Sequence, residues 1–384
     1  ILAMKKVDFF IVLYTIIILL SVMYATQPLQ PLLAKEFAIS VTQASFFTAV
    51  IMLFLAIAPI IYGYILERVN AKKVLIVASV ILSITNIFLG FSNSYEQFLF
   101  LRICEALVIP AILTACMSIL ASDKENTKRN MSFYVASTVF GGLIGRVMSG
   151  FIATELGWRY VFFSLSVALL VGLYFIFKLQ FEGEAKLTKA KVGDALLILK
   201  DKRFVVIYLL MFTVFFVFAG VLNILPFRIK ELFSDVTETH IGLLYLGYGV
   251  GIAVSLLIHK IIHLFKKELR TIVFGVFILA LSAILFLNPN IWFIFGTVFV
   301  LCFGMFTVHT VSTRLANSMK ESQKALTSGM YLTFYYIGGT LGSIIPSIIY
   351  EHFGWNSTMI LFVVCLVAIF FFVNSNKHHF KAYN

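Results

Sequence analysis

The sequence is dominated by apolar runs that are about as long as a lipid bilayer is thick. A transmembrane helix needs about 20 mainly apolar residues, and twelve stretches meet that requirement: near 9–29, 44–66, 74–93, 97–121, 132–154, 159–178, 204–226, 240–263, 271–288, 291–313, 326–350 and 356–374. With 61% hydrophobic and only 12% charged residues, the chain lacks the polar residues needed to cover a water-facing surface. We therefore expect an all-α integral membrane protein with twelve transmembrane helices.

The placement of the basic residues predicts how these helices are oriented. If the N-terminus lies inside, the inner loops and the two ends collect most of the 30 lysines and arginines, and the outer loops hold few. Cytoplasmic loops carry such an excess, so we expect both termini in the cytoplasm, at a cell inner membrane. The net charge of +12 is then a topology signal, and no nucleic acid partner is expected.

Neither a removed signal peptide nor a cysteine framework is indicated. Lys5 and Lys6 precede a long apolar run without a small-residue cleavage site, which predicts a retained first span. The four cysteines lie in apolar stretches and show neither CxxC nor Cys/His spacing. We expect them to be buried as small apolar side chains.

Two glycine-rich stretches half a chain apart reveal an internal repeat. GGLIGRVMSGFIATELGW, from Gly141, matches GGTLGSIIPSIIYEHFGW, from Gly338, at six positions with one constant offset, which equates the fifth span with the eleventh. Two parallel six-helix repeats form the architecture of one large class of secondary transporters. We expect three parts: an N-terminal six-helix bundle over 1–180, a cytoplasmic linker over 181–203 and a C-terminal six-helix bundle over 204–384. Within the linker, VGDALLILKDKRF is either an amphipathic helix at the inner interface or a solvated connection.

The glycines of the repeat are spaced to let helices approach each other closely. Arg146, in their midst, has no charged counterpart, because its mate in the second half is Ser343. We expect close helix packing at five positions: Gly141, Gly145, Gly150, Gly338 and Gly342.

A polar turn, GYILERVNAKK from Gly63 to Lys73, joins the second and third spans. An acid and a basic cluster at such a turn are suited to hold helix ends, although ordinary positive-inside flanking is the alternative. The turn resembles the loop signature of the major facilitator superfamily, G-x-L-a-D-r-x-G-r-k, with Glu in place of Asp and Asn70 in place of the second Gly. The resemblance implies that the loop closes the cytoplasmic gate through Gly63, Glu67, Arg68 and Lys72.

The fourth span carries two charges, Arg102 and Glu105, one helical turn apart on one face. Charged side chains within a span usually face a bundle interior or a water-filled cavity. Glu105 is the one carboxylate expected within a span and so the candidate proton carrier, since a nearby arginine favours its ionised form and a dry site its neutral form. The alternative is a permanent Arg–Glu clamp. The pair also resembles the superfamily's span-4 signature R-x-x-q-G.

Arg146 adds a third charge, in the fifth span. Counted from the outer ends of their spans, Glu105 and Arg146 both lie roughly 12 to 14 Å deep, so antiparallel neighbours would bring them to the same level. Uncompensated arginines within a membrane are costly. We therefore expect Arg102, Glu105 and Arg146 to form one buried triad that couples transport to protons.

Two further resemblances narrow the family. The stretch from Gly141 to Gly150 resembles the antiporter signature of the drug:proton branch, G-x-x-x-G-P-x-x-G-G, with Arg146 in place of Pro and Ser149 in place of Gly. A closer resemblance, over nearly the whole chain, is to the YnfM-like (arabinose-efflux-like) exporters. It rests on five motifs: Gly145-Arg146, Trp158-Arg159, QPLQPLL from Gln27, His309 and YLTFYYIGG from Tyr331.

His309, in the tenth span, titrates in the physiological range and is a candidate for a proton-coupling or gating role. A hydrogen bond to a neighbouring helix is the structural alternative. Met305 precedes His309 by one helical turn, so a third interpretation of His309 is a soft-metal site that both side chains form. We expect no metal.

Few polar side chains within the spans are available to a substrate. We expect its contacts to include Tyr24, Gln27, Phe216, Asn223 and Tyr335, in an aromatic-rich cavity suited to amphipathic or weakly polar solutes. The alternative is that such aromatic residues serve packing or lipid contact.

These features predict a secondary active transporter that exports a small organic solute or drug-like compound in exchange for protons. We expect a monomer that works by alternating access, with the proton gradient as its energy source and no cofactor. The nearest alternative is an importer, symporter or facilitator with the same fold, for a sugar, metabolite, siderophore or metal. A membrane-embedded enzyme has little support, because the sequence has no HExxH, nucleophile elbow or acid pair near a histidine.

Overall fold

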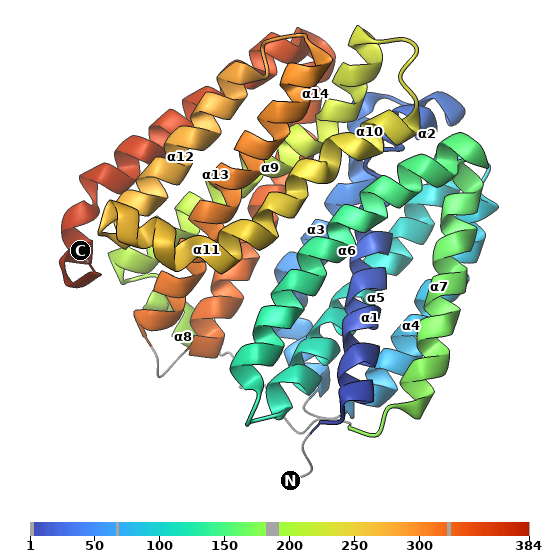
Figure 1. The fold of residues 1–384 in the computed structure, drawn as a ribbon, viewed down its shortest axis with the longest axis horizontal. Helices are drawn as coiled ribbons and strands as arrows, with labels where there is room; N and C mark the ends of the chain where they lie inside the picture. The colour runs from blue at the N-terminus through green and yellow to red at the C-terminus, as the bar shows by residue number, and fades with distance from the viewer. Residues whose placement is uncertain (1–3, 67–68, 182–191, 321–323, 384) are drawn as a thin grey trace. The chain divides into compact units, whose positions relative to one another are not determined.

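The computed structural model describes residues 4–66, 69–181, 192–320 and 324–383, and all regular secondary structure in these ranges is helical. Figure 1 shows the elements in order: α1 (Lys6–Tyr24), α2 (Gln30–Glu36), α3 (Val41–Leu66), α4 (Ala71–Gly90), α5 (Tyr95–Ser122), α6 (Thr127–Glu155), α7 (Trp158–Lys178), α8 (Val192–Ile198), α9 (Lys202–Leu232), α10 (Glu238–Leu244), η1 (Tyr245–Gly249), α11 (Val250–Phe265), α12 (Glu268–Leu285), α13 (Ile291–Ser318), α14 (Lys324–Ser375) and η3 (Lys377–Tyr383). Within the described residues, 11 candidate spans are long and apolar enough to cross a membrane. The expected all-α membrane fold is confirmed.

The last candidate span contains two of the expected helices. α14 has 52 residues, and at 1.5 Å per residue it would be roughly 78 Å long, more than twice the thickness of a bilayer core. Its backbone leaves the helical conformation at Gly354, where φ is 79° and ψ is −179°. The break separates the eleventh expected span from the twelfth.

Two expected spans differ from the structure in detail. The first, near 9–29, ends early, because α1 stops at Tyr24 and a turn precedes α2. Pro28 explains this end, since proline donates no backbone N–H and disfavours helical backbone at the residue before it. The span near 240–263 is interrupted by the 3₁₀ segment Tyr245–Gly249.

The repeat predicted from the sequence is present in the backbone. Gly157 and Gly354, which occupy equivalent places in the two glycine-rich stretches, are the two described glycines with positive φ, at 101° and 79°. Such angles strain residues with a Cβ. Each glycine precedes a buried tryptophan, Trp158 or Trp355, that begins the next span.

Close helix packing occurs at the predicted glycines, and at four of the five the partner helix is the first span of the same half. A Cβ on Gly145 would lie 2.4 Å from Cα of Ser21 in α1, and a Cβ on Gly342 would lie 2.2 Å from the carbonyl oxygen of Phe216 in α9. Both approaches are far shorter than real Cβ contacts. The helices therefore meet backbone to backbone, as small residues permit.

The other three glycines pack in the same way. A Cβ on Gly141 would lie 2.5 Å from the carbonyl oxygen of Ile17, and one on Gly338 would lie 2.2 Å from that of Phe212. Gly150 lies against α10, where a Cβ would be 2.3 Å from the carbonyl oxygen of Glu238. Any side chain at these positions would push neighbouring backbone aside.

The chain forms two compact units. Unit 1 comprises Ile1–Ile39, Ile57–Lys189 and Val236–Leu243, and unit 2 comprises Ser40–Ala56, Ala190–Asp235 and Leu244–Asn384. Each contains most of one six-helix half together with a short segment from the other half. The division into bundles at 1–180 and 204–384 stays a prediction. In the predicted linker, α8 forms a short helix within VGDALLILKDKRF, while residues 182–191 lie outside the described part.

In each unit, the short segment that comes from the other half of the sequence makes a polar contact. In unit 1, the backbone N–H of Thr239 donates to Oγ1 of Thr154 at 3.0 Å. In unit 2, the backbone N–H and the hydroxyl of Thr42 both donate to Oε2 of Glu351, at 3.1 and 2.6 Å. The constant offset of the repeat relates Thr42 to Thr239 and Thr154 to Glu351. The two contacts are therefore equivalent, with a carboxylate in one and a hydroxyl in the other.

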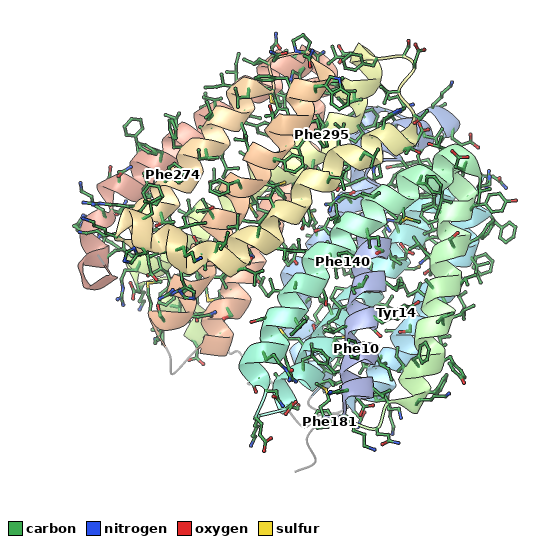
Figure 2. The ribbon with its side chains drawn as sticks, viewed as in Figure 1. Phe10, Tyr14, Phe140, Phe181, Phe274 and Phe295 are labelled. Atoms are coloured by element: carbon green, nitrogen blue, oxygen red, sulfur yellow. The ribbon has the colours of Figure 1, made fainter. Side chains whose placement is uncertain are left out.

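The outer faces of many helices carry large apolar side chains. Phe10 is 65% exposed and Phe140 is 42% exposed, and both are labelled in Figure 2. A protein in water would not expose so many such side chains, whereas lipid solvates them. The exposed side chains therefore agree with the membrane-spanning lengths of the helices.

We expect Gly145→Ala to lower the free energy of unfolding by about 1–3 kcal/mol, because its methyl group would collide with the backbone of α1. The matched control is Gly296→Ala in α13, where a Cβ would meet nothing within 4 Å. That change should be neutral or stabilise by about 0.5–1 kcal/mol, as Gly-to-Ala changes in exposed helices do. Denaturation of the purified protein in detergent measures both, and equal stability of the two variants would contradict the packing.

Candidate functional site

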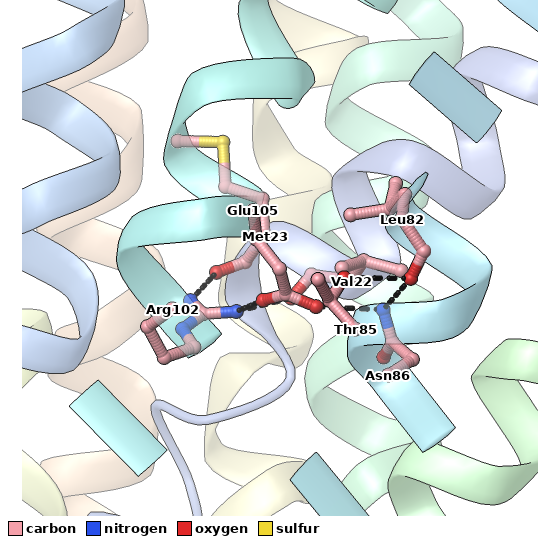
Figure 3. Close-up of polar contacts among 7 residues, drawn as sticks. All are labelled: Val22, Met23, Leu82, Thr85, Asn86, Arg102 and Glu105. Atoms are coloured by element: carbon pink, nitrogen blue, oxygen red, sulfur yellow. Dashed lines mark hydrogen bonds and ion pairs between the residues drawn. The ribbon is translucent and has the colours of Figure 1, made fainter. Parts of the chain in front are cut away.

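Arg102 and Glu105 form a buried ion pair in α5. Nη1 of Arg102 lies 2.6 Å from Oε2 of Glu105, and neither side chain is exposed (Figure 3). Glu105 comes ten residues after the start of α5 at Tyr95, roughly 15 Å along the helix and so near the middle of a bilayer. The spacing of the two residues predicted this contact, and their role in proton coupling stays a prediction.

The second oxygen of Glu105 is held by Asn86 of α4. Nδ2 of Asn86 donates to Oε1 of Glu105 at 2.6 Å and to the carbonyl oxygen of Leu82 at 2.9 Å, as Figure 3 shows. Asn86 is fully buried. It is not among the residues predicted from the sequence, although an asparagine within an apolar span is the kind of residue that bonds across membrane helices.

Arg102 also joins α5 to the end of α1. Its guanidinium donates to the carbonyl oxygens of Met23 at 3.0 Å and Val22 at 3.3 Å. These carbonyls lie in the last turn of α1, where no further helical N–H groups are available. A cation is also favoured at this negative end of the helix dipole. The premature end of α1 thus creates the acceptors that Arg102 uses.

Arg146 meets the same end of α1 from α6. Its Nε donates to Oε1 of Gln27 at 2.7 Å, and Nη1 donates to the carbonyl oxygen of Gly142 at 2.9 Å. The guanidinium carbon lies 3.9 Å from the centre of the Tyr24 ring, which is a cation–π contact. Arg146 is 1% exposed.

Both buried arginines therefore converge on the last turn of α1 and the segment that follows it. Arg102 binds carbonyls of that turn and the carboxylate of Glu105, while Arg146 binds Gln27 and covers Tyr24. All of these residues belong to unit 1. It stays a prediction that the three charged residues act as one triad. The structure adds that the end of α1 contacts both arginines.

His309 forms a hydrogen bond between two helices. Its Nδ1 lies 2.9 Å from the hydroxyl of Tyr331, which joins α13 to α14. Its ring also lies 5.0 Å from that of Tyr335. Met305 is fully buried, and no group of three or more His, Cys, Asp or Glu side chains in the described ranges could hold a metal ion. The contact with Tyr331 agrees with the structural alternative, and a proton-coupling role stays a prediction.

The predicted substrate contacts fall into two groups. Tyr24 and Gln27 lie with Arg146 in unit 1, as described above. In unit 2, Tyr335 stacks on Phe215 with ring centres 3.8 Å apart, and Phe216 and Asn223 are buried in α9 beside α14. The amide of Asn223 lies 3.5 Å from the carbonyl oxygen of Ser343. A role in substrate binding stays a prediction for all of them.

The predicted gate motif is described in part. Gly63 lies within α3, whereas Glu67 and Arg68 lie outside the described residues. Nζ of Lys72 donates to the carbonyl oxygen of Leu179 at 2.7 Å, just beyond the end of α7. A cation at a helix C-terminus is stabilising, so Lys72 holds a helix end as expected of this turn.

The chain matches the sequence model of one family, described as the Major Facilitator Superfamily, over residues 11–319 and 231–381. It is 20% identical to the inner membrane transport protein YnfM of Escherichia coli, over 93% of this chain and 87% of that protein. It is 25% identical to the multidrug efflux protein YfmO of Bacillus subtilis, over 85% of this chain and 82% of that protein.

Solved structures share the fold over the full length. A bacterial homolog to the human lysosomal transporter Spinster, in an inward-facing and unoccupied conformation, superposes with a TM-score of 0.83 at 15% identity, covering 99% of each chain. The nucleoside transporter NupG superposes with a TM-score of 0.76 at 13% identity, covering 98% of this chain and 100% of that one.

We expect Arg102→Met to lower the free energy of unfolding by about 3–5 kcal/mol, because it leaves the carboxylate of Glu105 buried without its cation. The loss should shrink as the pH falls, since a protonated Glu105 no longer needs a positive partner. The double variant Arg102→Met/Glu105→Gln should regain much of the lost stability. Denaturation curves of the purified variants at several pH values measure this, and a double variant no more stable than the single one would contradict the ion pair.

Proposed function

The chain belongs to the major facilitator superfamily, and on that premise we propose that it exports a small organic solute in exchange for protons. As a member of this family it is a secondary transporter that spans the membrane several times. Alternating access to a central site moves the solute. The proton gradient supplies the energy, so no cofactor is required.

The observation that carries the proposal is the buried carboxylate of Glu105. Among the described residues, Arg102, Glu105 and Arg146 are the buried charges in the middle of spans, while the other buried acids, Asp8 and Asp123, lie at helix ends. A buried acid within a membrane helix is costly and is characteristic of proton relays. Glu105 is therefore the proton carrier of the proposed cycle.

The partners of Glu105 suit the form that has released its proton. Oε2 accepts from Arg102 and Oε1 accepts from Asn86, so the named partner of each oxygen is a donor. A carboxyl proton on either oxygen would face one of these donors, and that hydrogen bond would break. Loading a proton therefore requires α5 to change its contact with α4 or with the arginine that holds the end of α1.

The positive charge of Arg102 provides the release step. Arg102 stabilises the ionised acid directly and also binds two carbonyl oxygens at the end of α1. An opposite charge nearby favours the ionised form, and its removal favours the neutral form. Movement of α1 relative to α5 during the transport cycle would change this balance and so load or release the proton.

The direction of transport and the solute class are proposed from the relatives and from unit 2. YfmO is named a multidrug efflux protein, which supports export. The stacked Tyr335 and Phe215 and the ring of His309 beside Tyr335 give unit 2 an aromatic interior. Such an interior suits amphipathic or weakly polar solutes.

We place the protein, as a monomer, in a bacterial inner membrane with both termini in the cytoplasm.

The second candidate is the same fold working as an importer, symporter or facilitator. NupG, whose structure superposes over the whole chain, is named a nucleoside transporter. A buried acid paired with an arginine also serves a symporter, in which the proton and the solute move together. The direction of proton movement relative to the solute separates the two.

We expect Glu105→Gln to abolish uphill, proton-driven transport and to leave solute binding and exchange in place. The amide keeps the shape of the side chain but cannot take up or release a proton at physiological pH. A susceptibility and uptake panel on cells with and without the protein first identifies a transported solute. Efflux of that solute is then followed in inverted membrane vesicles with an imposed pH gradient.

Glu96→Gln is the matched control, because Glu96 is an exposed acid in the first turn of the same helix. It should transport as the parent does. Undiminished uphill efflux by Glu105→Gln would contradict the proposed proton coupling.

A further inference from the structure

Asn86 has a chemical property that Glu105 lacks. Its side-chain amide offers two donors on Nδ2 and an acceptor on Oδ1, whereas an ionised carboxylate only accepts. In the structure both donors are used, on Oε1 of Glu105 and on the carbonyl oxygen of Leu82. Oδ1 is buried and accepts no hydrogen bond from any described residue. A buried acceptor without a partner costs free energy, so its presence beside a titratable group calls for an explanation.

A protonated Glu105 would supply a hydrogen-bond donor for Oδ1 of Asn86. A proton on Oε1 would point at Nδ2, which cannot accept it. Rotation of the amide about its Cβ–Cγ bond would bring Oδ1 to the place of Nδ2, where it accepts the new O–H. The rotation gives up the bond to Leu82, so each form of the acid has its own arrangement of Asn86.

The charged and titratable groups near this contact are few. α5 itself contributes Arg102 and Cys104. Of the helices that contact α5, α6 carries Arg146, α1 carries Tyr24, and α3 carries Tyr62, whose hydroxyl donates to the carbonyl oxygen of Leu107 in α5. α4 contributes no titratable side chain there, because its two lysines, Lys72 and Lys73, lie in its first turn. Asn86 is thus the neutral group in contact with Glu105 that is able to respond to both of its forms.

We propose that Asn86 is a positioning residue whose orientation depends on the protonation state of Glu105. Its amide donates to the ionised acid and turns to accept from the neutral one. The inference deepens the proposed proton coupling and rests on it for its role in transport. The turn of the amide breaks the bond to Leu82 and so passes the state of the acid in α5 to the backbone of α4.

Two variants of nearly the parent's shape test the proposal. The parent Asn86 donates and accepts, Asn86→Leu does neither, and Asn86→Asp only accepts when it is ionised. The purified full-length protein in lipid is titrated with acid and followed by infrared difference spectroscopy. The carboxylic-acid carbonyl band that is absent from Glu105→Gln belongs to Glu105. Its height at each pH gives the midpoint of protonation without any need for transport.

We expect the midpoint to rise by about 1 to 2 pH units in Asn86→Leu, because the ionised acid loses a charge-assisted hydrogen bond. It should rise further in Asn86→Asp, because two facing carboxylates share one proton. An unchanged midpoint in Asn86→Leu would overturn the proposal, because it would mean that Asn86 does not stabilise the ionised acid.

The position of the band gives a second test that needs no variant at Asn86. An acid whose O–H donates a hydrogen bond absorbs at lower frequency than a free acid, so the neutral Glu105 of the parent should absorb at the lower frequency. A band at the free-acid frequency would refute the turned amide even if the variants failed to fold. Failure of Glu105→Gln to lose proton-driven efflux would refute the coupling alone, because the titration reports the contact itself.

Discussion

The cost of a charge in hydrocarbon is the constraint on which this structure depends. An arginine and a glutamate in the middle of a span are tolerated only when each is paired and hydrogen-bonded. Here Arg102 satisfies Glu105 and the open carbonyls of α1, while Asn86 satisfies the remaining carboxylate oxygen. Because both carboxylate oxygens accept from donors, a proton on Glu105 would disturb its contact with Asn86 of α4 or with Arg102, which binds the end of α1. One proton would thereby change the contacts of α5 with a neighbouring helix.

The scaffold around this site is repeated, and the charges are the exceptions to the repeat. Gly145 presses on α1 as Gly342 presses on α9, and Gly157 and Gly354 make the same turn. Arg146, in contrast, has Ser343 as its equivalent, and Ser343 meets the neutral Asn223. Among the described residues, the buried charges in the middle of spans therefore lie in unit 1, whereas unit 2 offers mainly aromatic side chains. This division fits a transporter that handles the proton in one half of the sequence and contacts the solute chiefly in the other.

The features that could be predicted from the sequence are those that depend on local pattern. Span lengths follow from hydrophobicity, the pairing of Arg102 with Glu105 follows from helical spacing, and the turns at Gly157 and Gly354 follow from a repeated motif. Partners across helices could not be predicted in this way. The glycine stripe indicated a close neighbour without identifying α1, and a lone Asn86 among apolar residues carries no spacing signal that points to Glu105. Tertiary packing decides such contacts.

In the proposed cycle, protons and solute move in opposite directions through the chemistry of Glu105. The most direct measurement is proton movement in sealed proteoliposomes that contain a pH-sensitive dye, when a gradient of the transported solute is imposed without a pH gradient. We expect protons to cross against the direction of the solute in the parent and not to cross in Glu105→Gln. Protons that move with the solute, or solute that moves down its gradient in the parent without any protons, would contradict it.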